Sequence, residues 1–375
     1  MIAVADINTL WRRKPFEALS LQTPVLGLMP QDVVAAWRNK DAKPAPETAR
    51  KLTILPLTLP PGWASRLAGI VAPYLGWKIR QQARSSGEKI QGLVVTSPHY
   101  LELVKRTAPH MRTFYYCSDD YAQYANWGGT AILQKEAELA RRVDHCFFVS
   151  RPLADRAVSE YGLEEGRVSV SPNATDAAFL QRSTDEQRAA LHRAFPALRH
   201  PWVGVVGAIN SRLDFDLIEA CCSLPSVGSV VMVGPVDPTC QDEGLRRLRQ
   251  NPKCVFVGPR PHGELPAWMQ ALDVALIPYR DTPLNRACSP MRLFDHLAAG
   301  KPVVGTAVNA QVASFEPLIS IGHTTREVCE RVESVLNGPS EDFSPAQIAA
   351  AKLETWDHRA ARILQTMGAS LSNSL

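Results

Sequence analysis

The sequence has neither a long apolar run nor a metal-ligand spacing, and these absences exclude several classes of protein. No stretch approaches the roughly 18 apolar residues that a membrane-spanning helix needs. The eight cysteines include no Cys-x-x-Cys pair, and several lie inside apolar segments, as reduced core thiols do. The apolar run at residues 1–5 is too short for a signal peptide. We therefore expect a cytoplasmic protein without a structural metal.

Internal repeats, low-complexity tracts and a Gly-x-Gly-x-x-Gly fingerprint are also missing. The sequence instead alternates short apolar strands with helical segments over 375 residues, of which 45% are hydrophobic. This length allows two cores, and the alternation predicts an α/β protein of two Rossmann-like domains. We predict a first domain at residues 1–172, a linker at 173–200, a second domain at 201–352, and a helix and tail at 353–375.

The net charge is only +4, but it is unevenly distributed. Residues 1–118 contain sixteen Lys and Arg against seven Asp and Glu, a balance of +9, which leaves the remaining residues at −5. A basic region predicts an anionic partner. Because no RNA- or DNA-binding module is present, nucleic acid is not expected, and an anionic membrane surface fits better. The alternative is an ordinary solvated basic surface.

Two segments of the first domain have a helical pattern. Residues 63–84 alternate apolar residues with Arg and Lys, which predicts a basic amphipathic helix broken near Pro73. Such a helix either lies on a membrane or packs against the sheet. Residues 31–50 are polar and are predicted to be helical in part.

The most informative stretch runs from Leu284 to Thr306. Ser289 is a good N-cap and Pro290 suits the first helical position, so a helix is predicted to begin there. Gly300 follows its last turn as a C-cap, and an apolar strand comes next. Residues 273–279 are predicted to form another buried strand. The loop between that strand and the helix therefore lies at a carboxyl end, where open α/β sheets bind ligands.

The start of this helix is suited to a phosphate, because a helix N-terminus presents free N–H groups and a partial positive charge. Arg286 and Arg292 can add positive charge. Asp295, about one and a half turns into the helix, can reach a hydroxyl beside the phosphates. A diphosphate next to a sugar hydroxyl describes a nucleotide sugar.

The segment Ser-Pro-Met-Arg-Leu-Phe-Asp-His-Leu-Ala-Ala-Gly-Lys-Pro-Val-Val, residues 289–304, resembles the donor-site signature of the group 1/group 4 GT-B glycosyltransferases. The resemblance implies two Rossmann-like domains that face each other across a cleft, with the last helix crossing back to the first domain. It implies that Asp295 holds the donor ribose and that the amides around Ser289, Pro290 and Met291 hold the diphosphate. The family usually has Glu at the place of Asp295, and Ala287 stands where many retaining members have a second acid.

The loop after the first strand of the second domain contains Gly207, Asn210 and Arg212. Gly207 lets the backbone approach a ligand, and Arg212 can pair with a phosphate oxygen. In the resembling family a basic residue in this loop neutralises the departing diphosphate, which implies a catalytic role for Arg212. A surface arginine is the alternative. The resemblance also places the loop containing Arg260 at the edge of the nucleotide base.

In the first domain, the strand that begins at Thr113 ends in Asp119 and Asp120. This segment resembles the Asp-containing loop of bacterial polysaccharide-biosynthesis glycosyltransferases, including xanthan glucuronosyltransferase-like enzymes. The resemblance implies that Asp119 is a general base that removes the proton of an acceptor hydroxyl. Asp120 is a second candidate. Alternatively, either residue caps the following helix.

The resembling family places a loop over the acceptor cleft after the first strand. Here that loop is predicted at residues 8–15, and a second loop follows the strand at residues 92–98. The first loop contains a basic cluster, Trp11 with Arg12, Arg13 and Lys14. This cluster would bind a lipid diphosphate or an anionic sugar, or it is a surface patch. The acceptor-side candidates are Trp11, Arg12, Arg13, Lys14, His99 and Tyr100.

Taken with the resemblance, the sequence predicts a metal-independent hexosyltransferase without a cofactor. Its donor would be a nucleotide-diphosphate sugar. The expected acceptor is a lipid-linked saccharide in bacterial cell-surface polysaccharide synthesis, and the basic region would then face the inner side of the cell membrane. Two alternatives stay open: a nucleotide-sugar 2-epimerase, and a degenerate sugar-nucleotide-binding scaffold, which Asp295 and the missing Glu motivate.

Overall fold

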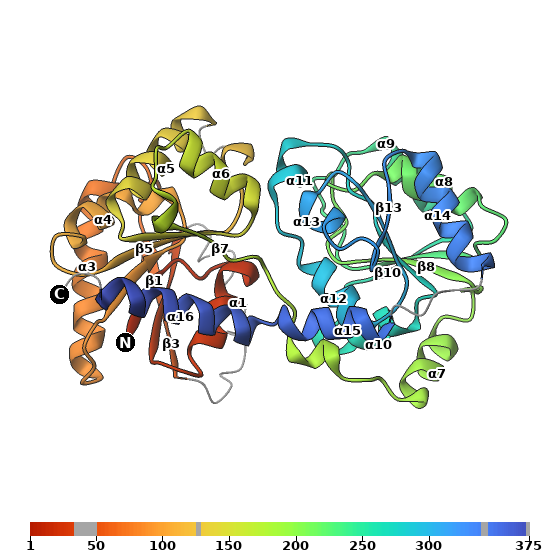
Figure 1. Cartoon of the computed structure of the whole chain (residues 1–375), viewed down its shortest axis with the longest axis horizontal. Coiled ribbons are helices and arrows are strands. Elements are labelled where there is room, and N and C mark those ends of the chain that lie inside the picture. The colour runs from red at the N-terminus through yellow and green to blue at the C-terminus, as the bar shows by residue number, and fades with distance from the viewer. Residues whose placement is uncertain (34–50, 125–128, 339–343, 373–375) are drawn as a thin grey trace. The chain divides into compact units, whose positions relative to one another are not determined.

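The computed structural model describes residues 1–33, 51–124, 129–338 and 344–372. The chain forms two compact units: unit 1 contains Met1–Asn173 and Trp356–Leu375, and unit 2 contains Ala174–Thr355 (Figure 1). Most of the predicted part-helical segment 31–50 lies outside the described residues. Within the described residues, no helix combines the length and the apolar character needed to cross a bilayer.

Unit 1 is built on a seven-stranded sheet of order β3-β2-β1-β4-β5-β6-β7, in which neighbouring strands pair in parallel. Its strands are β1 (Ile2–Ala5), β2 (Val25–Asp32), β3 (Leu52–Leu59), β4 (Gly92–Val95), β5 (Thr113–Cys117), β6 (His145–Phe148) and β7 (Val168–Val170). Its α-helices are α1 (Leu10–Leu19), α3 (Ala68–Ser85), α4 (Leu101–Thr107), α5 (Thr130–Arg142), α6 (Arg151–Ser159) and α16 (Trp356–Ser372).

Unit 2 has a six-stranded parallel sheet of order β10-β9-β8-β11-β12-β13. Its strands are β8 (Trp202–Val206), β9 (Ser229–Val233), β10 (Cys254–Gly258), β11 (Val274–Ile277), β12 (Val303–Thr306) and β13 (Ser320–Gly322). Its α-helices are α7 (Asp185–Ala194), α8 (Phe215–Ser223), α9 (Glu243–Gln250), α10 (Leu265–Ala271), α11 (Pro283–Ala287), α12 (Met291–Ala299), α13 (Ala310–Ala313), α14 (Thr325–Asn337) and α15 (Ser344–Leu353).

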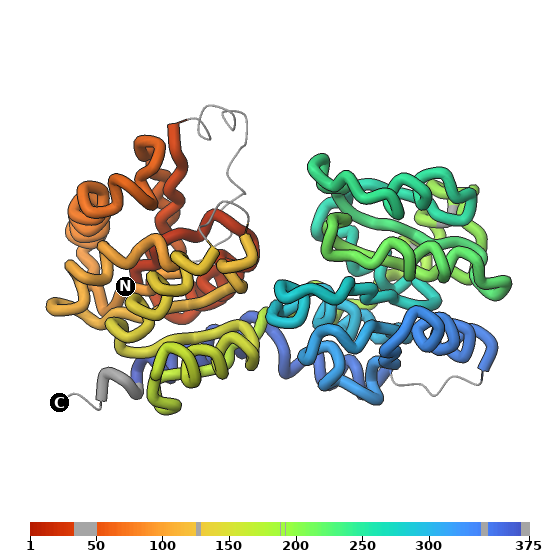
Figure 2. The backbone as a smooth tube through the Cα atoms, turned by 90° about the horizontal axis from the view of Figure 1, so that it is seen from above, coloured from red at the N-terminus to blue at the C-terminus, as the bar shows by residue number. Residues whose placement is uncertain are grey.

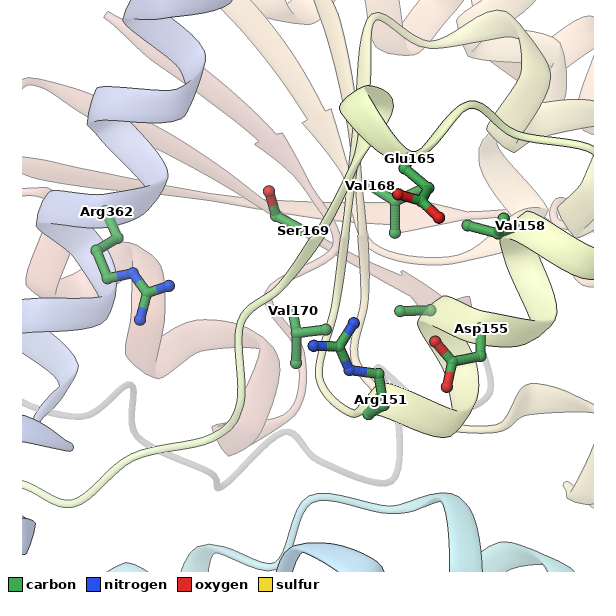
Figure 3. A pocket seen from close by; sticks show the side chains of 9 residues that line it. Arg151, Asp155, Val158, Glu165, Val168, Ser169, Val170 and Arg362 are labelled. Carbon is green, nitrogen blue, oxygen red and sulfur yellow. The ribbon is translucent and has the colours of Figure 1, made fainter.

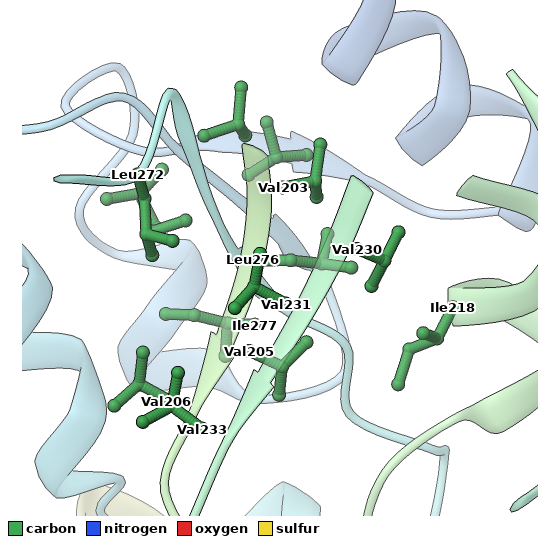
Figure 4. Close-up of a cluster of buried hydrophobic side chains, with 14 of the residues drawn as sticks. Val203, Val205, Val206, Ile218, Val230, Val231, Val233, Leu272, Leu276 and Ile277 are labelled. Atoms are coloured by element: carbon green, nitrogen blue, oxygen red, sulfur yellow. The ribbon is translucent and has the colours of Figure 1, made fainter. Parts of the chain in front are cut away.

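The central strands of unit 2 are apolar along their length, as expected for a parallel sheet with helices on both faces. Figure 4 shows side chains from β8, β9 and β11 packed together, with Ile218 of α8 and Leu272 beside them. All five residues of β8 are buried. This core holds the ends of the strands in fixed positions, and the loops that follow them inherit that rigidity.

The strand order reverses at one place in each sheet, between β1 and β4 in unit 1 and between β8 and β11 in unit 2. In open α/β sheets the crevice at such a reversal, outside the carboxyl ends of the strands, is where ligands bind. The fold therefore points to two loop clusters, one in each unit.

The predicted linker at residues 173–200 is almost entirely part of unit 2 rather than a separate connection. Thr184 and Gln187 form a reciprocal capping box at the start of α7. Phe195 then packs edge-to-face on Trp268 of α10, with the ring centroids 5.2 Å apart. The segment predicted as a linker thus contains a capped helix whose end packs on the aromatic side chains of unit 2.

The last helix, α16, lies in unit 1, where it packs against α1. In both backbone views this blue helix lies among the earlier elements of the chain (Figures 1 and 2). Arg359 attaches it by donating from Nε to the carbonyl of Pro172, at 3.1 Å. Unit 1 is thus assembled from both ends of the sequence.

Candidate functional site

The carboxyl ends of β8 and β11 bring together the loop 207–214, Tyr279 and the start of α12. Gly207 directly follows β8 and has a φ of +119°, a value that favours glycine. A side chain there would also meet the Arg292 guanidinium, because a Cβ at Gly207 would lie 3.0 Å from Nη2. Asn210 shapes the same loop by accepting a hydrogen bond from the backbone N–H of Arg212, at 3.1 Å.

Two arginines lie against the ring of Tyr279, which comes just after β11. The guanidinium carbons of Arg212 and Arg292 are 5.6 and 5.5 Å from the ring centroid. Arg212 donates from Nε to Asn285 Oδ1 at 2.9 Å, and Arg292 donates from Nη2 to the carbonyl of Ala208 at 3.2 Å. The aromatic ring thus contacts two positive charges at the place where the fold predicts a ligand.

Arg292 has a buried donor available for a ligand. Its Nη1 atom is buried and has no hydrogen-bond partner among the described residues. A buried guanidinium N–H without an acceptor is costly, and an anion would satisfy it. The sequence pointed to Arg292 only as a source of added charge, because its proximity to Gly207 and Tyr279 depends on the packing of two loops that are distant in sequence.

The start of α12 differs from the prediction by one residue. Pro290 has extended backbone angles and is itself the N-cap, so the helix begins at Met291. Ser289 does not cap the helix; its hydroxyl is 2.8 Å from Gln311 Oε1 and donates to it. At the other end Gly300 is left-handed with φ +60°, as a glycine C-cap requires. Through Arg292, the first turn of α12 still contacts the loop that follows β8.

Arg286 is occupied by another partner. It lies on α11, a short helix where the sequence predicted a loop, and it forms a bidentate ion pair with Asp281 at 2.6 and 2.8 Å. Both side chains are more than half exposed. The predicted donor role of Arg286 therefore competes with a carboxylate that already binds it.

Asp295, the predicted ribose ligand, accepts a hydrogen bond from Thr175 Oγ1 at 2.7 Å. Thr175 is fully buried, and its backbone N–H is bonded to the carbonyl of Glu354 at 2.9 Å. Asp295 therefore lies next to the two backbone segments at the ends of unit 2. Sequence spacing gave no indication of this contact, because Thr175 and Asp295 are 120 residues apart.

Arg260 packs into the aromatic cluster of unit 2. Its guanidinium lies 5.1 Å from the ring centroid of Phe195 and 5.9 Å from that of Trp268, and Nη2 donates to the carbonyl of Val257 at 3.1 Å. These contacts give Arg260 a structural role in addition to the predicted one at the nucleotide base.

The two carboxylates after β5 have different surroundings. Asp120 is 3% exposed and forms a bidentate pair with Arg156 of α6, at 3.0 and 2.8 Å. Asp119 is 8% exposed and accepts from Tyr124 Oη at 2.6 Å and from the backbone N–H of Asp120 at 3.0 Å. Burial and the Asp119 carboxylate raise the pKa of Tyr124, which keeps that phenol a hydrogen-bond donor. Neither side chain caps the short helical turn that begins at Tyr121, so the capping alternative is wrong there.

A buried glutamate lies behind this loop. Glu136 of α5 accepts from the hydroxyls of Tyr115 and Tyr161 at 2.5 and 2.7 Å, and from Cys117 Sγ at 3.2 Å. Burial raises the pKa of Glu136, whereas these donors oppose the increase. Because Cys117 also contacts the carbonyl of Asp119 at 3.3 Å, the network fixes the backbone from which Asp119 projects.

The predicted basic loop at residues 8–15 is instead largely the beginning of α1. Arg12 is 4% exposed and donates from Nη1 to Asp6 Oδ2 at 2.6 Å. Although burial opposes its charge, Tyr121 and Asp6 raise the pKa of Arg12. Arg13 and Lys14 pair with Glu17 at 2.9 and 3.7 Å.

These contacts alter the interpretation of the basic cluster. The Arg12 charge is neutralised inside unit 1, so it does not contribute to a basic surface. Trp11 is half-buried, and its indole Nε1 is buried without a hydrogen-bond partner among the described residues. That indole N–H is a donor still available to a ligand near the carboxyl end of β1.

The loop after β4 contains the other two acceptor-side candidates. Burial and the nearby cations Lys135 and Arg12 lower the pKa of His99 to about 4, so the imidazole is neutral at about pH 7. Tyr100 is 1% exposed, and its hydroxyl has no partner among the described residues. Its ring contacts Trp63, with centroids 5.7 Å apart.

A cavity of about 530 Å³ lies elsewhere in unit 1, along β7. Figure 3 shows Arg151 and Asp155 of α6, Glu165, and Arg362 of α16 around it. It contains none of the predicted site residues, and its charges have both signs. Within the described residues, no group of three or more His, Cys, Asp or Glu side chains could hold a metal ion.

Comparison with known proteins bears on both units. Residues 219–365 match the family described as Glycosyl transferase-like. A relative from Bacillus subtilis (strain 168), TuaH, is 38% identical over 117 residues. It is described as a putative teichuronic acid biosynthesis glycosyltransferase. That alignment covers 31% of this chain and 29% of TuaH, so the chain matches less than a third of this relative.

Solved structures are similar over nearly the whole chain. Anabaena HepE in complex with UDP has a TM-score of 0.75 at 14% identity, covering 98% of this chain and 99% of HepE. Sucrose-phosphate synthase from Thermosynechococcus elongatus has a TM-score of 0.73 at 17% identity, covering 100% and 99%. At these identities the likeness shows the fold, which is that of the GT-B glycosyltransferases. The family match points to the same class of protein for residues 219–365.

Proposed function

We propose that the chain transfers a sugar from a nucleotide-diphosphate sugar to an acceptor hydroxyl. The observation that carries the proposal is the pair of arginines, Arg212 and Arg292, on the ring of Tyr279 at the strand-order reversal of unit 2. Because Gly207 has no side chain, the Arg292 guanidinium can lie close to the backbone of the loop that follows β8. Two guanidinium groups on one aromatic ring, near a helix N-terminus, are suited to a diphosphate.

The same positive groups would also assist the transfer step. As the glycosidic bond to the diphosphate breaks, negative charge grows on the leaving oxygen. Arg212, Arg292 and the α12 N-terminus stabilise that charge, which is the largest electrostatic contribution available to the reaction. Because these positive charges belong to the protein, we propose that transfer does not require a metal ion.

Asp119 is the proposed base in unit 1. Its carboxylate receives hydrogen bonds from the neutral donors Tyr124 Oη and the Asp120 N–H, whereas both oxygens of Asp120 are bonded to the Arg156 guanidinium. Asp119 would take the proton of the acceptor hydroxyl as its oxygen attacks the anomeric carbon. A true base at this position implies inversion of the anomeric configuration, whereas retention is consistent with a role in orientation only.

The relatives support a choice of donor and acceptor classes to test. HepE structures contain UDP and UDP-glucose, which supports a uridine diphosphate hexose as the donor to test first. The name of TuaH supports an acceptor in cell-surface polysaccharide synthesis. We propose a lipid-linked saccharide as this acceptor, used at the inner face of the cell membrane.

A thermal-shift screen of UDP, GDP, dTDP and ADP tests the donor site. A nucleotide at about 100 times its dissociation constant adds about 2.7 kcal/mol of stability. Loss of a charge-assisted hydrogen bond, at roughly 1.5–3 kcal/mol, predicts that Arg292→Ala or Arg212→Ala weakens binding about 10- to 100-fold. Arg286→Ala is the matched control, because Arg286 is bound to Asp281 and its loss should change binding less than about twofold.

The outcomes separate the alternatives. No stabilisation of the folded protein by any nucleotide would overturn the donor site. Equal losses in Arg286→Ala and Arg292→Ala would show that general positive charge, rather than the pair on Tyr279, binds the nucleotide. Turnover of the donor without any acceptor would overturn glycosyl transfer in favour of chemistry on the nucleotide sugar alone.

A further inference from the structure

Large apolar side chains are exposed along one face of α3. Ile70, Tyr74 and Trp77 are 75%, 39% and 49% exposed. Their spacing of four and three residues places them on one side of a helix. We call these three side chains the α3 stripe. Exposed apolar groups that gather in one place are typical of an interaction surface, so the stripe is a candidate for one.

The stripe is separate from the face by which α3 joins unit 1. Val71, Leu75 and Ile79 are buried, and the helix packs against α4 (Figure 1). The predicted break at Pro73 is absent, since α3 is continuous. Pro73 cannot donate to the carbonyl of Gly69, and Arg106 of α4 donates to that oxygen instead, at 3.3 Å. The helix is therefore held firmly with the stripe facing outward.

The charged residues of the segment that contains the stripe have one sign. Residues 60–87 contain four cations, Arg66, Lys78, Arg80 and Arg84, and no Asp or Glu. At about 100° per residue, Lys78 and Arg80 lie on opposite sides of the stripe. Lys78 Nζ is 5.0 Å from the ring centroid of Trp77 and 5.8 Å from that of Tyr74. The partner must therefore offer negative charge and apolar contact at the same time.

We propose that the α3 stripe and its four cations dock unit 1 on an anionic lipid membrane. Trp and Tyr side chains favour the headgroup region, Ile favours the acyl boundary, and Lys and Arg extend to the lipid phosphates. A lipid leaflet provides both kinds of contact without a complementary shape. A second copy of the chain would instead place the four cations against one another, which like charges oppose.

The docking surface adjoins the predicted acceptor loop. Trp63, which precedes α3, contacts Tyr100 in the loop after β4, with ring centroids 5.7 Å apart. A docked unit 1 would therefore hold that loop near the lipid surface, where a lipid-linked acceptor is available. This part of the inference rests on the proposed function, whereas the docking itself does not.

Flotation with vesicles tests the docking, using phosphatidylcholine alone or mixed with phosphatidylglycerol. The protein should float only with the anionic vesicles. Removing a cation near such a surface weakens binding about fivefold, so Arg80→Gln/Arg84→Gln should lower the partition coefficient about 25-fold. Ile70→Ser/Trp77→Ser should abolish flotation. Leu353→Ser and Arg246→Gln/Arg249→Gln, matched exposed changes in unit 2, should leave it unchanged.

Three results would overturn the proposal: no flotation with anionic vesicles, equal flotation with neutral ones, or unchanged flotation of the α3 variants. A dimer of the free protein that Trp77→Ser abolishes would overturn it in favour of a second copy. Stabilisation by UDP is measured on the same variants and should be unchanged. If the protein does not bind UDP but still floats with anionic vesicles, the proposed function is wrong and the docking proposal is unaffected.

Discussion

The carboxyl ends of the two sheets have the same strand-order reversal, yet their charged groups are used differently. In unit 1 two arginines are bound to carboxylates of the same unit, Arg12 to Asp6 and Arg156 to Asp120. In unit 2, by contrast, Arg212 and Arg292 lie on an aromatic ring and donate to neutral oxygens. The first arrangement uses charge to fix loops in place, whereas the second directs positive charge toward the position of an anion.

The same comparison distinguishes the two carboxylates that follow β5 in unit 1, Asp119 and Asp120. Asp120 is held on both oxygens by a guanidinium, so a proton from a substrate hydroxyl would have to displace that ion pair. The donors to Asp119 include the Tyr124 hydroxyl and a backbone N–H, both of which are neutral. A base must be able to accept a proton, so the surroundings of Asp119 suit that role better.

The largest expected effect comes from Asp119→Asn. Loss of a general base predicts a decrease of about 10²- to 10⁴-fold in the rate of transfer, with nucleotide binding unchanged. The matched variant Asp120→Asn should unfold more easily, since it leaves Arg156 beside a neutral amide. Turnover measured with the true acceptor, together with urea unfolding, separates these effects. If Asp119→Asn raises only the KM for the acceptor, Asp119 orients the acceptor and is not the base.

Sequence reasoning identified the elements whose signals are local. The parallel strands, the α12 segment and its Gly300 C-cap follow from apolar runs and from Pro and Gly positions. The pairing of Arg12 with Asp6 depends on how α1 turns back across the end of β1, which local pattern does not encode. Asp120 and Arg156 are 36 residues apart, so their contact cannot be predicted from sequence periodicity either.

The sequence predicted a loop where α11 forms, for a similar reason. The helix α11 has only five residues, and it begins where Thr282 Oγ1 accepts a hydrogen bond from the backbone N–H of Asn285. Asn285 is fully buried and donates to the carbonyls of Arg212 and Arg280, at 2.9 and 2.8 Å. Its side chain thus holds two loops of the donor site together, a role that no motif indicated.

A second prediction concerns the buried pair in unit 1. Arg12→Met leaves Asp6 with an uncompensated buried charge, so we expect a loss of about 3–5 kcal/mol in the free energy of unfolding. Arg13→Met removes a more exposed pair with Glu17 and should cost less than about 1 kcal/mol. Urea titration of both variants measures the difference. Equal stabilities, with a higher KM for the acceptor in Arg12→Met, would instead favour the original interpretation of Arg12 as an acceptor ligand.

The effect expected to be smallest within one pH unit concerns two histidines, His296 in unit 2 and His99 in unit 1. Burial, with the nearby Arg292, lowers the pKa of His296 to about 3, and the pKa of His99 is lowered to about 4. Because an unfolded histidine titrates near about pH 6.5, the unfolded chain binds protons below that pH that the folded chain does not. Stability should therefore fall as the pH drops below about 6.5, by up to about 1.4 kcal/mol per pH unit for each group.

Variants of the two histidines show how much of the pH dependence of stability comes from each unit. His296→Leu should flatten the loss of stability between about pH 6.5 and about pH 3, and His99→Gln should flatten it only down to about pH 4. Urea unfolding at several pH values measures both slopes. His296 has no hydrogen-bond partner among the described residues on either ring nitrogen, so its replacement removes a titrating group without breaking a bond. An unchanged slope in His296→Leu would mean that Arg292 and burial do not keep this histidine neutral, and that the start of α12 admits a second positive charge.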